Sequence, residues 1–239
     1  MRTRVLVVDD EPAVGEIVQA VLESVGMEAD YLSDTRKAAL RLTTEKLDAI
    51  FLDVHMPQPD GLALARLIRA DGFSRETPIV MITGEENPAI LKAGFEAGAN
   101  FFLFKPFNRL GLLRVVRVSQ ALDRGQKRGF QRAVVCVPVR IESKERTLEG
   151  ITFDLSLSGM LVEAPGIFAP GTAVQVTVHL PQGRPPMQLS GRVVRVLGNQ
   201  RMGIEFLNLV TAEGKVLQGF LLPLILSQIG AELPVSPRA

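Results

Sequence analysis

Two different hydrophobic periods divide the chain near its middle. Up to about residue 122, short and almost wholly apolar runs alternate with longer stretches in which apolar residues recur at helical spacing. Continuous apolar runs are typical of strands buried on both faces of a parallel sheet, and the stretches between them predict covering helices. The apolar runs are Val5–Val8, Ala49–Leu52, Pro78–Thr83 and Phe101–Phe104, with a weaker strand near Glu28–Leu32. This half therefore predicts a doubly wound α/β domain around a parallel five-stranded sheet.

The helical stretches carry their own end signals. Gly15–Gly26 and Gly61–Gly72 each end in a glycine, which can close a helix. The last helix of this half is expected to begin after Asn108, a good N-cap residue, and to run to about Arg124 before Gly125. Its apolar residues lie on more than one face. One stripe can cover the sheet, and the excess is available to a second domain or a second chain.

After Ala133 the apolar period changes to two. Six strand-like runs follow, separated by short clusters of Gly, Pro, Asn and Ser, and they predict an all-β six-stranded antiparallel barrel. The runs begin at Ala133, Leu148, Gly159, Ala173, Met187 and Met202. A C-terminal helix is expected over about 211–229, where its apolar residues either cover the open end of the barrel or form a homodimer contact. We place the domains at 1–124 and 125–239.

Composition narrows the class of protein. The 239 residues suit two domains, and the net charge of +1 gives no broad basic field for nucleic acid. The single cysteine, Cys136, excludes an internal disulfide framework and fits a reducing compartment. The N-terminus lacks the pattern of a signal peptide, and the most apolar stretch, Val216–Leu226, is too short to span a bilayer. We therefore expect a cytoplasmic protein without a transmembrane segment.

Polar side chains gather where the predicted parallel strands end. The strand ends carry Asp9, Asp10, Glu11, Asp53, Thr83, Gly84 and Lys105. In doubly wound sheets, ligands collect at this edge. Clustered carboxylates repel one another, and a divalent cation such as Mg²⁺ relieves the repulsion. A carboxylate held there can accept a phosphoryl group, with positive charge from a lysine and a hydrogen bond from a hydroxyl. Any one of these residues alone could equally be a polar strand cap.

Four stretches of this half, VLVVDDEP, LDVHMPQPDG, MITG and LFKPF, together resemble the receiver domain of two-component response regulators. The resemblance covers about Arg2 to Arg124 and implies a flavodoxin-like fold. It implies that Asp53 accepts a phosphoryl group from a sensor histidine kinase or a phosphotransfer protein, assisted by Thr83 and Lys105. It also implies an Mg²⁺ site, whose ligands would be Asp10, Asp53 and the backbone carbonyl of His55, with Asp9 acting through water.

The same resemblance implies a conformational switch made of Thr83 and Phe102. The family often has a tyrosine or phenylalanine three residues before the lysine, and here it is Phe102, which has no hydroxyl. A plain core aromatic in the fifth strand is an equally good interpretation. The only chemistry implied is self-phosphorylation and its hydrolysis, so we expect no enzyme acting on an external substrate.

The second half has a candidate ligand site of its own. Arg128 and Arg132 stand four positions apart ahead of the barrel, and Asp154, Ser156 and Gly159 follow the order D-x-S-x-x-G. Guanidinium groups can fork onto phosphate and stack on purines, so a ligand with two phosphates and two purines would use both modes. Either motif alone is weak, because Asp, Ser and Gly also build turns and arginines also occur in solvated linkers.

Together the two motifs resemble the PilZ domain, a receptor module for cyclic di-GMP, over roughly Lys127 to Leu209. The resemblance implies that all five motif residues contact the dinucleotide, although some members of the family keep the barrel and do not bind it. The leading hypothesis is a response regulator that responds to phosphorylation and to cyclic di-GMP and signals to an unknown downstream protein. The alternative is a phosphorylation-controlled protein adaptor. No DNA partner is expected, because the long helix of this half is almost uncharged.

Overall fold

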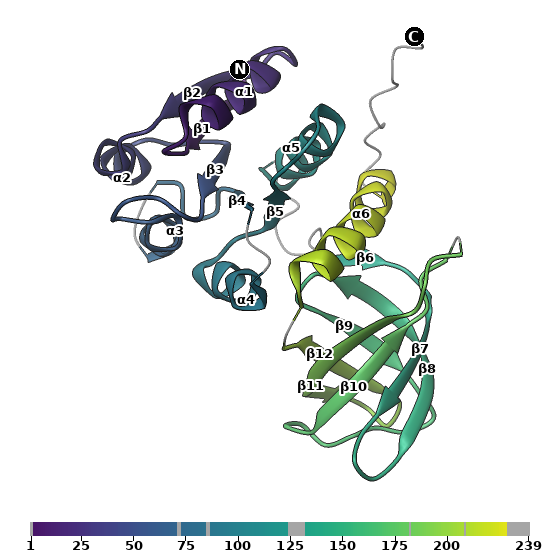
Figure 1. Ribbon diagram of the computed structural model, residues 1–239. Helices are drawn as coiled ribbons and strands as arrows, with labels where there is room; N and C mark the ends of the chain where they lie inside the picture. Colours follow the sequence, from purple (N-terminus) through teal and green to yellow (C-terminus); the bar gives the residue numbers. More distant parts are fainter. Residues whose placement is uncertain are drawn as a thin grey trace. The chain divides into compact units, whose positions relative to one another are not determined.

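The computed structural model describes residues 2–70, 73–84, 87–123, 132–181, 183–207 and 209–228 (Figure 1). They form two compact units, one around a parallel sheet and one around an antiparallel sheet. Each unit is described by itself.

The first sheet has the strand order β2-β1-β3-β4-β5, and all its pairings are parallel. Its strands are Arg4–Val8 (β1), Glu28–Leu32 (β2), Ala49–Asp53 (β3), Ile79–Thr83 (β4) and Phe101–Phe104 (β5). Every residue of β3, β4 and β5 is buried, as continuous apolar runs predict for strands covered on both faces. β2 lies at an edge and is partly exposed, which explains its weaker signal. The flavodoxin-like doubly wound sheet is thus confirmed.

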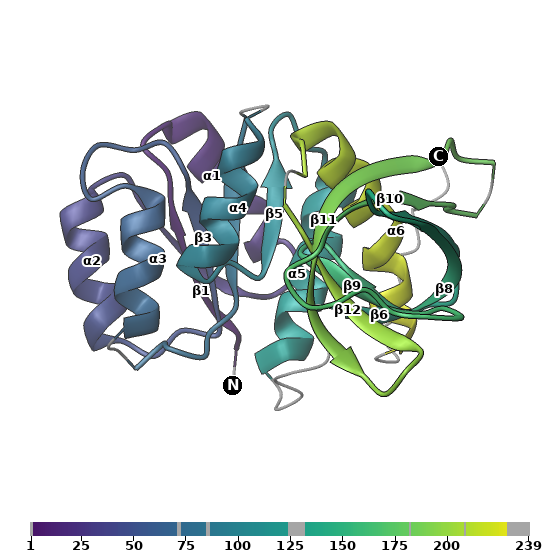
Figure 2. The same cartoon turned by 90° about the horizontal axis from the view of Figure 1, so that it is seen from below.

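Five helices cover this sheet: Pro12–Glu23 (α1), Thr35–Thr44 (α2), Gly61–Ala70 (α3), Pro88–Ala97 (α4) and Arg109–Asp123 (α5). α1 packs beside α5. Figure 2 shows α2 packed beside α3. α1 begins earlier than Gly15, because Pro12 has a fixed φ that suits the first turn of a helix. Asn108 caps α5 as expected, since its Oδ1 accepts the Gly111 N–H at 2.8 Å.

The second sheet closes into a barrel. Its strands are Arg132–Val134 (β6), Pro138–Glu142 (β7), Thr147–Ser156 (β8), Gly159–Glu163 (β9), Ala173–Val178 (β10), Met187–Leu197 (β11) and Arg201–Phe206 (β12). The long strand β8 pairs with β6 and β7 along one edge and with β9 along the other, which completes the ring β7-β10-β11-β12-β9-β8. β6 and β7 are two pieces of the first predicted strand, so the six-stranded barrel is confirmed.

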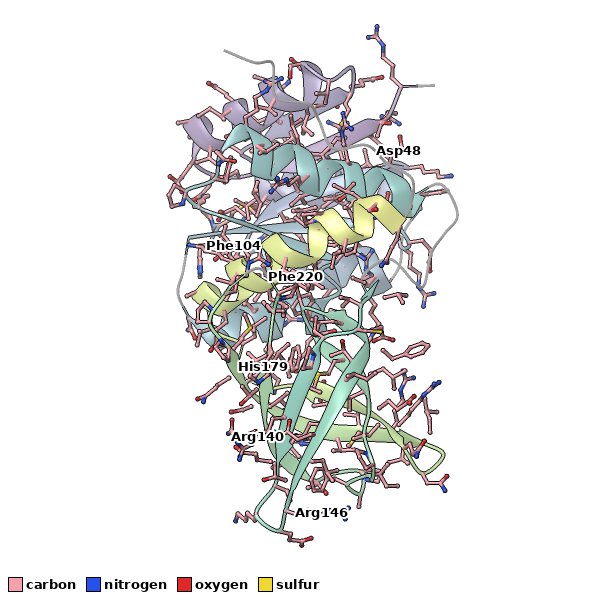
Figure 3. The ribbon with its side chains drawn as sticks, turned by 90° about the vertical axis from the view of Figure 1, so that its right-hand side faces the viewer. Asp48, Phe104, Arg140, Arg146, His179 and Phe220 are labelled. Atoms are coloured by element: carbon pink, nitrogen blue, oxygen red, sulfur yellow. The ribbon has the colours of Figure 1, made fainter. Side chains whose placement is uncertain are left out.

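The gap between β6 and β7 is bridged by a buried threonine. The Thr152 hydroxyl accepts the Val137 N–H at 3.0 Å and donates to the Val135 carbonyl. These bonds replace the ladder bonds that the interruption removes. From the sequence, Cys136 falls within the first predicted strand of the barrel and is expected to be a small packing residue, but it lies in this gap and is exposed, so that prediction is wrong. His179 alternates in the sequence with Val178 and Leu180, which predicts a solvent-facing side chain, and it is exposed while those two are buried (Figure 3).

The last described element is the helix Thr211–Gln228 (α6), close to the expected range. It contains Pro223, and its apolar residues do not form one narrow stripe. Within the second unit, the Arg184 guanidinium lies over the Phe220 ring at 5.4 Å from its centroid, so this part of α6 contacts the loop before β11. In the part of the chain that the structure describes, no helix has the length and apolarity that a bilayer span requires.

Candidate phosphorylation and nucleotide sites

Three carboxylates meet at the carboxyl edge of the parallel sheet. β1 and β3 are neighbours in register, with Val8 opposite Leu52, so the residues that follow them lie side by side. Oxygen atoms of Asp9, Asp10 and Asp53 all lie within 4.8 Å of one another. Asp9 and Asp53 are buried, whereas Asp10 is exposed. The arrangement presents hard oxygen ligands from two strands to one point, as the sequence predicted.

Lys105 extends from the end of β5 into this cluster. Its Nζ lies 2.8 Å from Asp53 Oδ1, 2.9 Å from Glu11 Oε1 and 3.3 Å from Asp9 Oδ2. Burial alone would lower the pKa of the Lys105 ammonium, but its hydrogen bonds to Asp53 and Glu11 outweigh burial and raise it. Lys105 is therefore a fixed positive charge beside Asp53. The contact with Glu11, 94 positions away, was not predicted, because it depends on the side-chain conformations at the two strand ends.

Burial dominates the titration of the two inner carboxylates. The pKa of Asp9 is raised to about 6, mainly by burial and further by the charge of Asp53. Burial likewise raises the pKa of Asp53, although Lys105 opposes the shift. Asp9 Oδ2 is buried and accepts no hydrogen bond from the described residues, even though Lys105 lies near it. A buried carboxylate oxygen within a cluster of three carboxylates fits a divalent cation such as Mg²⁺, for which Asp9, Asp10 and Asp53 would supply ligands.

Backbone contacts hold the Asp53 carboxylate in place. Its Oδ2 accepts the His55 N–H at 2.8 Å, which fixes the loop that carries the His55 carbonyl. At the first residue of α3, a Cβ added to Gly61 would lie 2.0 Å from the Asp53 carbonyl oxygen. Only glycine allows α3 to begin this close to Asp53. Gly61 thus supports the site by letting α3 begin beside Asp53. The PDG sequence contains this glycine, but we assigned it no role from the sequence. Thr83 is buried at the end of β4, two strands from β1.

In the barrel, the structure brings together part of the second motif. Arg132 Nη1 donates to Asp154 Oδ1 at 2.6 Å, from β6 to β8. Asp154 Oδ1 also accepts the Leu161 N–H at 3.2 Å, so the carboxylate joins three strands. A β-bulge in β8 between Thr152 and Asp154 lets Asp154 face outward. Arg128 lies outside the described residues.

The two units correspond to two known families. Residues 5–117 match the response regulator receiver domain, and residues 126–222 match the PilZ domain. The chain carries a receiver domain followed by a PilZ domain. It is therefore a response regulator with a PilZ domain as its second module.

Curated relatives and solved structures each match part of this chain. The DNA-binding response regulator MtrA of Mycolicibacterium smegmatis is 33% identical over 126 residues, which are 53% of each chain. This chain thus spans about half the length of that relative. Response regulator MprA of Mycobacterium tuberculosis is 29% identical over 198 residues, 68% of this chain and 85% of MprA. The chemotaxis protein CheY4 of Vibrio cholerae is 31% identical, with a TM-score of 0.48 over 50% of this chain and 99% of CheY4.

Within the receiver domain, Phe102 is fully buried. Its ring meets Phe95 edge-on at 5.0 Å between centroids and stacks on Phe104 at 5.9 Å. A Cβ added to Gly94 of α4 would come within 2.6 Å of the Phe102 ring, so this glycine provides the space that the ring occupies. The structure thus describes an inward ring, and its role in a switch with Thr83 stays a prediction.

Within the PilZ domain, Ser156 and Gly159 of the D-x-S-x-x-G motif both stabilise the local fold of the barrel. The Ser156 hydroxyl donates to the Gly159 carbonyl at 2.9 Å and closes the turn between β8 and β9. A Cβ on Gly159 would lie 2.3 Å from the Ile204 carbonyl oxygen, so the close approach of β9 to β12 requires glycine there. Contacts of Ser156 and Gly159 with a nucleotide stay predictions.

Proposed function

We propose that this response regulator accepts a phosphoryl group on Asp53 and that its PilZ domain binds cyclic di-GMP. The phosphoryl donor would be the phosphohistidine of a sensor kinase or phosphotransfer protein. The chemistry is confined to the chain itself: Asp53 is phosphorylated, and the acyl phosphate is later hydrolysed. We further propose a cytoplasmic location, which suits the single exposed cysteine.

The contact between Lys105 and Asp53 at 2.8 Å is the observation that supports phosphorylation best. In the transfer, one Asp53 oxygen forms a bond to phosphorus while the P–N bond of the phosphohistidine breaks and its electron pair returns to the imidazole. Lys105 balances the charge of the incoming phosphoryl oxygens, and the His55 N–H orients the Asp53 carboxylate. Bound Mg²⁺ would supply further positive charge to those oxygens.

The ion pair between Arg132 and Asp154 at 2.6 Å supports nucleotide binding best. Asp154 engages one nitrogen of the guanidinium, Nη1, and thereby orients the others. An oriented guanidinium on a barrel surface is suited to fork onto a phosphate. Arg132 would therefore bind a phosphate of the dinucleotide, and Asp154 would hold the arginine or accept from a guanine N–H.

Phosphorylation is tested by intact mass after incubation with Mg²⁺ and acetyl phosphate. Wild type should gain the mass of one phosphoryl group, and Asp53→Asn should not. Asp30→Asn is the matched control, because Asp30 is an exposed carboxylate at the far edge of the same sheet. Unchanged phosphorylation of Asp53→Asn would place the acceptor elsewhere.

Nucleotide binding is tested by calorimetry with cyclic di-GMP on the full chain. We expect Arg132→Ala to weaken binding by roughly 10- to 100-fold, the range for loss of a charge-assisted hydrogen bond. Arg140→Ala is the matched control, because Arg140 is also an ion-paired arginine on the barrel surface but lies on β7. If correctly folded wild type releases no heat, the adaptor function replaces the receptor function. If both sites act on one switch, their coupling is reciprocal in free energy.

A further inference from the structure

Tyr31, the single tyrosine of the chain, connects the edge strand β2 to the cluster of three carboxylates. Its hydroxyl donates to the backbone carbonyl of Asp9 at 2.9 Å, across 22 positions of sequence. The hydrophobic pattern gave β2 a weak strand signal and Tyr31 no role. The folded sheet therefore places a polar group of its edge strand beside the proposed Mg²⁺ site.

The hydroxyl of Tyr31 holds the peptide group that joins Asp9 to Asp10. A peptide group is planar, so holding its carbonyl oxygen holds the whole unit in one orientation. β2 also holds the other side of Asp9, whose N–H donates to the Leu32 carbonyl at 3.3 Å. Asp9 and Asp10 supply two of the three clustered carboxylates, and their side chains depart from the two ends of this peptide group. Its orientation therefore decides where those two carboxylates point.

The space for the Tyr31 ring is provided by a glycine of α1. A Cβ added to Gly15 would lie 2.1 Å from Tyr31 Cε2 and 2.4 Å from its Cδ2, so any other residue would displace the ring. The Gly15 N–H donates to the Glu11 carbonyl at 3.1 Å, which ties the loop after β1 to the helix. Glycine is unfavourable inside a helix, so its presence here matches the space that the ring needs. Gly15 and Tyr31 thus form a complementary pair that keeps the hydroxyl against Asp9.

Asp10 is the carboxylate that depends most on this backbone contact. Its side chain is exposed, so packing does not fix it, whereas Asp9 and Asp53 are buried. Carboxylates that lie this close repel one another when no cation is bound, and the repulsion favours loop conformations that separate them. Metal affinity falls in proportion to the fraction of molecules whose ligands are already in place. A hydrogen bond that holds the Asp9–Asp10 peptide raises this fraction.

We propose that Tyr31 is a positioning residue of the Mg²⁺ site, and that its hydroxyl holds the Asp9–Asp10 peptide in the orientation that presents both carboxylates to the ion. This proposal rests on the proposed phosphorylation of Asp53, which that ion assists. Tyr31 touches neither the ion nor the phosphoryl group. Because the role belongs to the hydroxyl, removal of this oxygen alone should weaken metal binding while the ring still packs over Gly15.

Metal binding by the full chain tests this role without any reaction. Mn²⁺ takes the same carboxylate and water ligands as Mg²⁺, and its free form is measured by electron paramagnetic resonance, with Mg²⁺ as competitor. Tyr31→Phe should weaken the binding of both ions by roughly 3- to 10-fold, the range for loss of one neutral hydrogen bond. Gly15→Ala should also weaken it, because the added methyl group displaces the ring that carries the hydroxyl.

Thr44→Val is the matched control. The Thr44 hydroxyl also donates to a backbone carbonyl of the same domain, that of Leu40 at 2.8 Å, but it lies on α2. This variant should bind both ions as wild type does. A loss equal to that of Tyr31→Phe would show a general effect of removing a hydroxyl and would overturn the positioning role.

The Mg²⁺ dependence of phosphorylation by acetyl phosphate separates positioning from chemistry. Tyr31→Phe should require roughly 3- to 10-fold more Mg²⁺ for the half-maximal rate and should reach the wild-type rate at saturation, because Asp53 and Lys105 are intact. If Tyr31→Phe binds metal and responds to Mg²⁺ as wild type does, Tyr31 only fills the space over Gly15 and the proposed function stands. A lower saturating rate with unchanged metal affinity would also overturn the positioning role. Folded wild type that binds neither ion would overturn both this proposal and the assistance of Mg²⁺ in the proposed function.

Discussion

Replacing Asp9 by Asn is expected to stabilise the metal-free protein at neutral pH. Asp9 is fully buried, and burial raises its pKa from 3.8 to about 6. Each pKa unit corresponds to about 1.4 kcal/mol, so keeping this carboxylate ionised costs the folded state about 3 kcal/mol at pH 7. Asn keeps the oxygen that accepts the Glu11 N–H, at 2.9 Å in the wild type, and removes the charge.

The pH dependence of this stability difference follows from the direction in which the Asp9 pKa is shifted. The folded protein holds the Asp9 proton more tightly than the unfolded chain, so wild type loses stability as pH rises from about 4 through about 6. Asp9→Asn mimics the protonated form and has no such loss. Its advantage should therefore be absent near pH 4 and reach about 3 kcal/mol above pH 6.

Urea denaturation at pH 4 and pH 7.5, in a chelator, measures this difference. Asp10→Asn serves as the control, because Asp10 belongs to the same cluster but is exposed and should give a much smaller gain. Added Mg²⁺ should shrink the advantage of Asp9→Asn, because the ion stabilises only the intact carboxylate cluster well. Equal stability of wild type and Asp9→Asn at pH 7.5 without metal would refute the reasoning.

Substitutions at three further positions test the fold by denaturation. Gly61→Ala should lower the free energy of unfolding by more than about 2 kcal/mol, because its Cβ would lie 2.0 Å from the Asp53 carbonyl oxygen. A loss below about 0.5 kcal/mol would show that α3 shifts freely. Gly219→Ala should instead gain roughly 0.5–1 kcal/mol, since this exposed helical glycine has no atom within 4 Å of an added Cβ, and any loss contradicts that picture. Asn108→Ala should lower the free energy of unfolding by about 1 kcal/mol, because it removes the N-cap of α5. Asn108→Asp should preserve most of the stability that the cap provides.

The parallel sheet was predictable because its strands are buried on both faces. That burial leaves uninterrupted apolar runs such as Val5–Val8, and the polar residues after them must meet at one edge. The cluster of Asp9, Asp10 and Asp53 followed directly from this rule. The contact between Glu11 and Lys105 did not, since it depends on side-chain conformations at the two strand ends.

The barrel was predictable in its period but not in its irregularities. The run beginning at Ala133 reads as one strand, yet it is interrupted before Pro138, where the Thr152 hydroxyl takes over the backbone hydrogen bonds. Alternation also predicts the wrong face for Arg195, because an inserted residue in β11 reverses the pattern beyond Val193. Bulges leave little trace in the hydrophobic pattern, so the face on which Arg195 lies is visible only in the folded register.

The most direct test of two inputs on one molecule is a titration of the full chain with cyclic di-GMP. It is performed with and without Mg²⁺ and beryllium fluoride, a phosphoryl mimic for Asp53. We expect saturable binding in both arms and different dissociation constants, as coupling between the two proposed sites would require. Folded protein that binds no cyclic di-GMP in either arm, or that binds it with equal constants in both, would contradict this expectation.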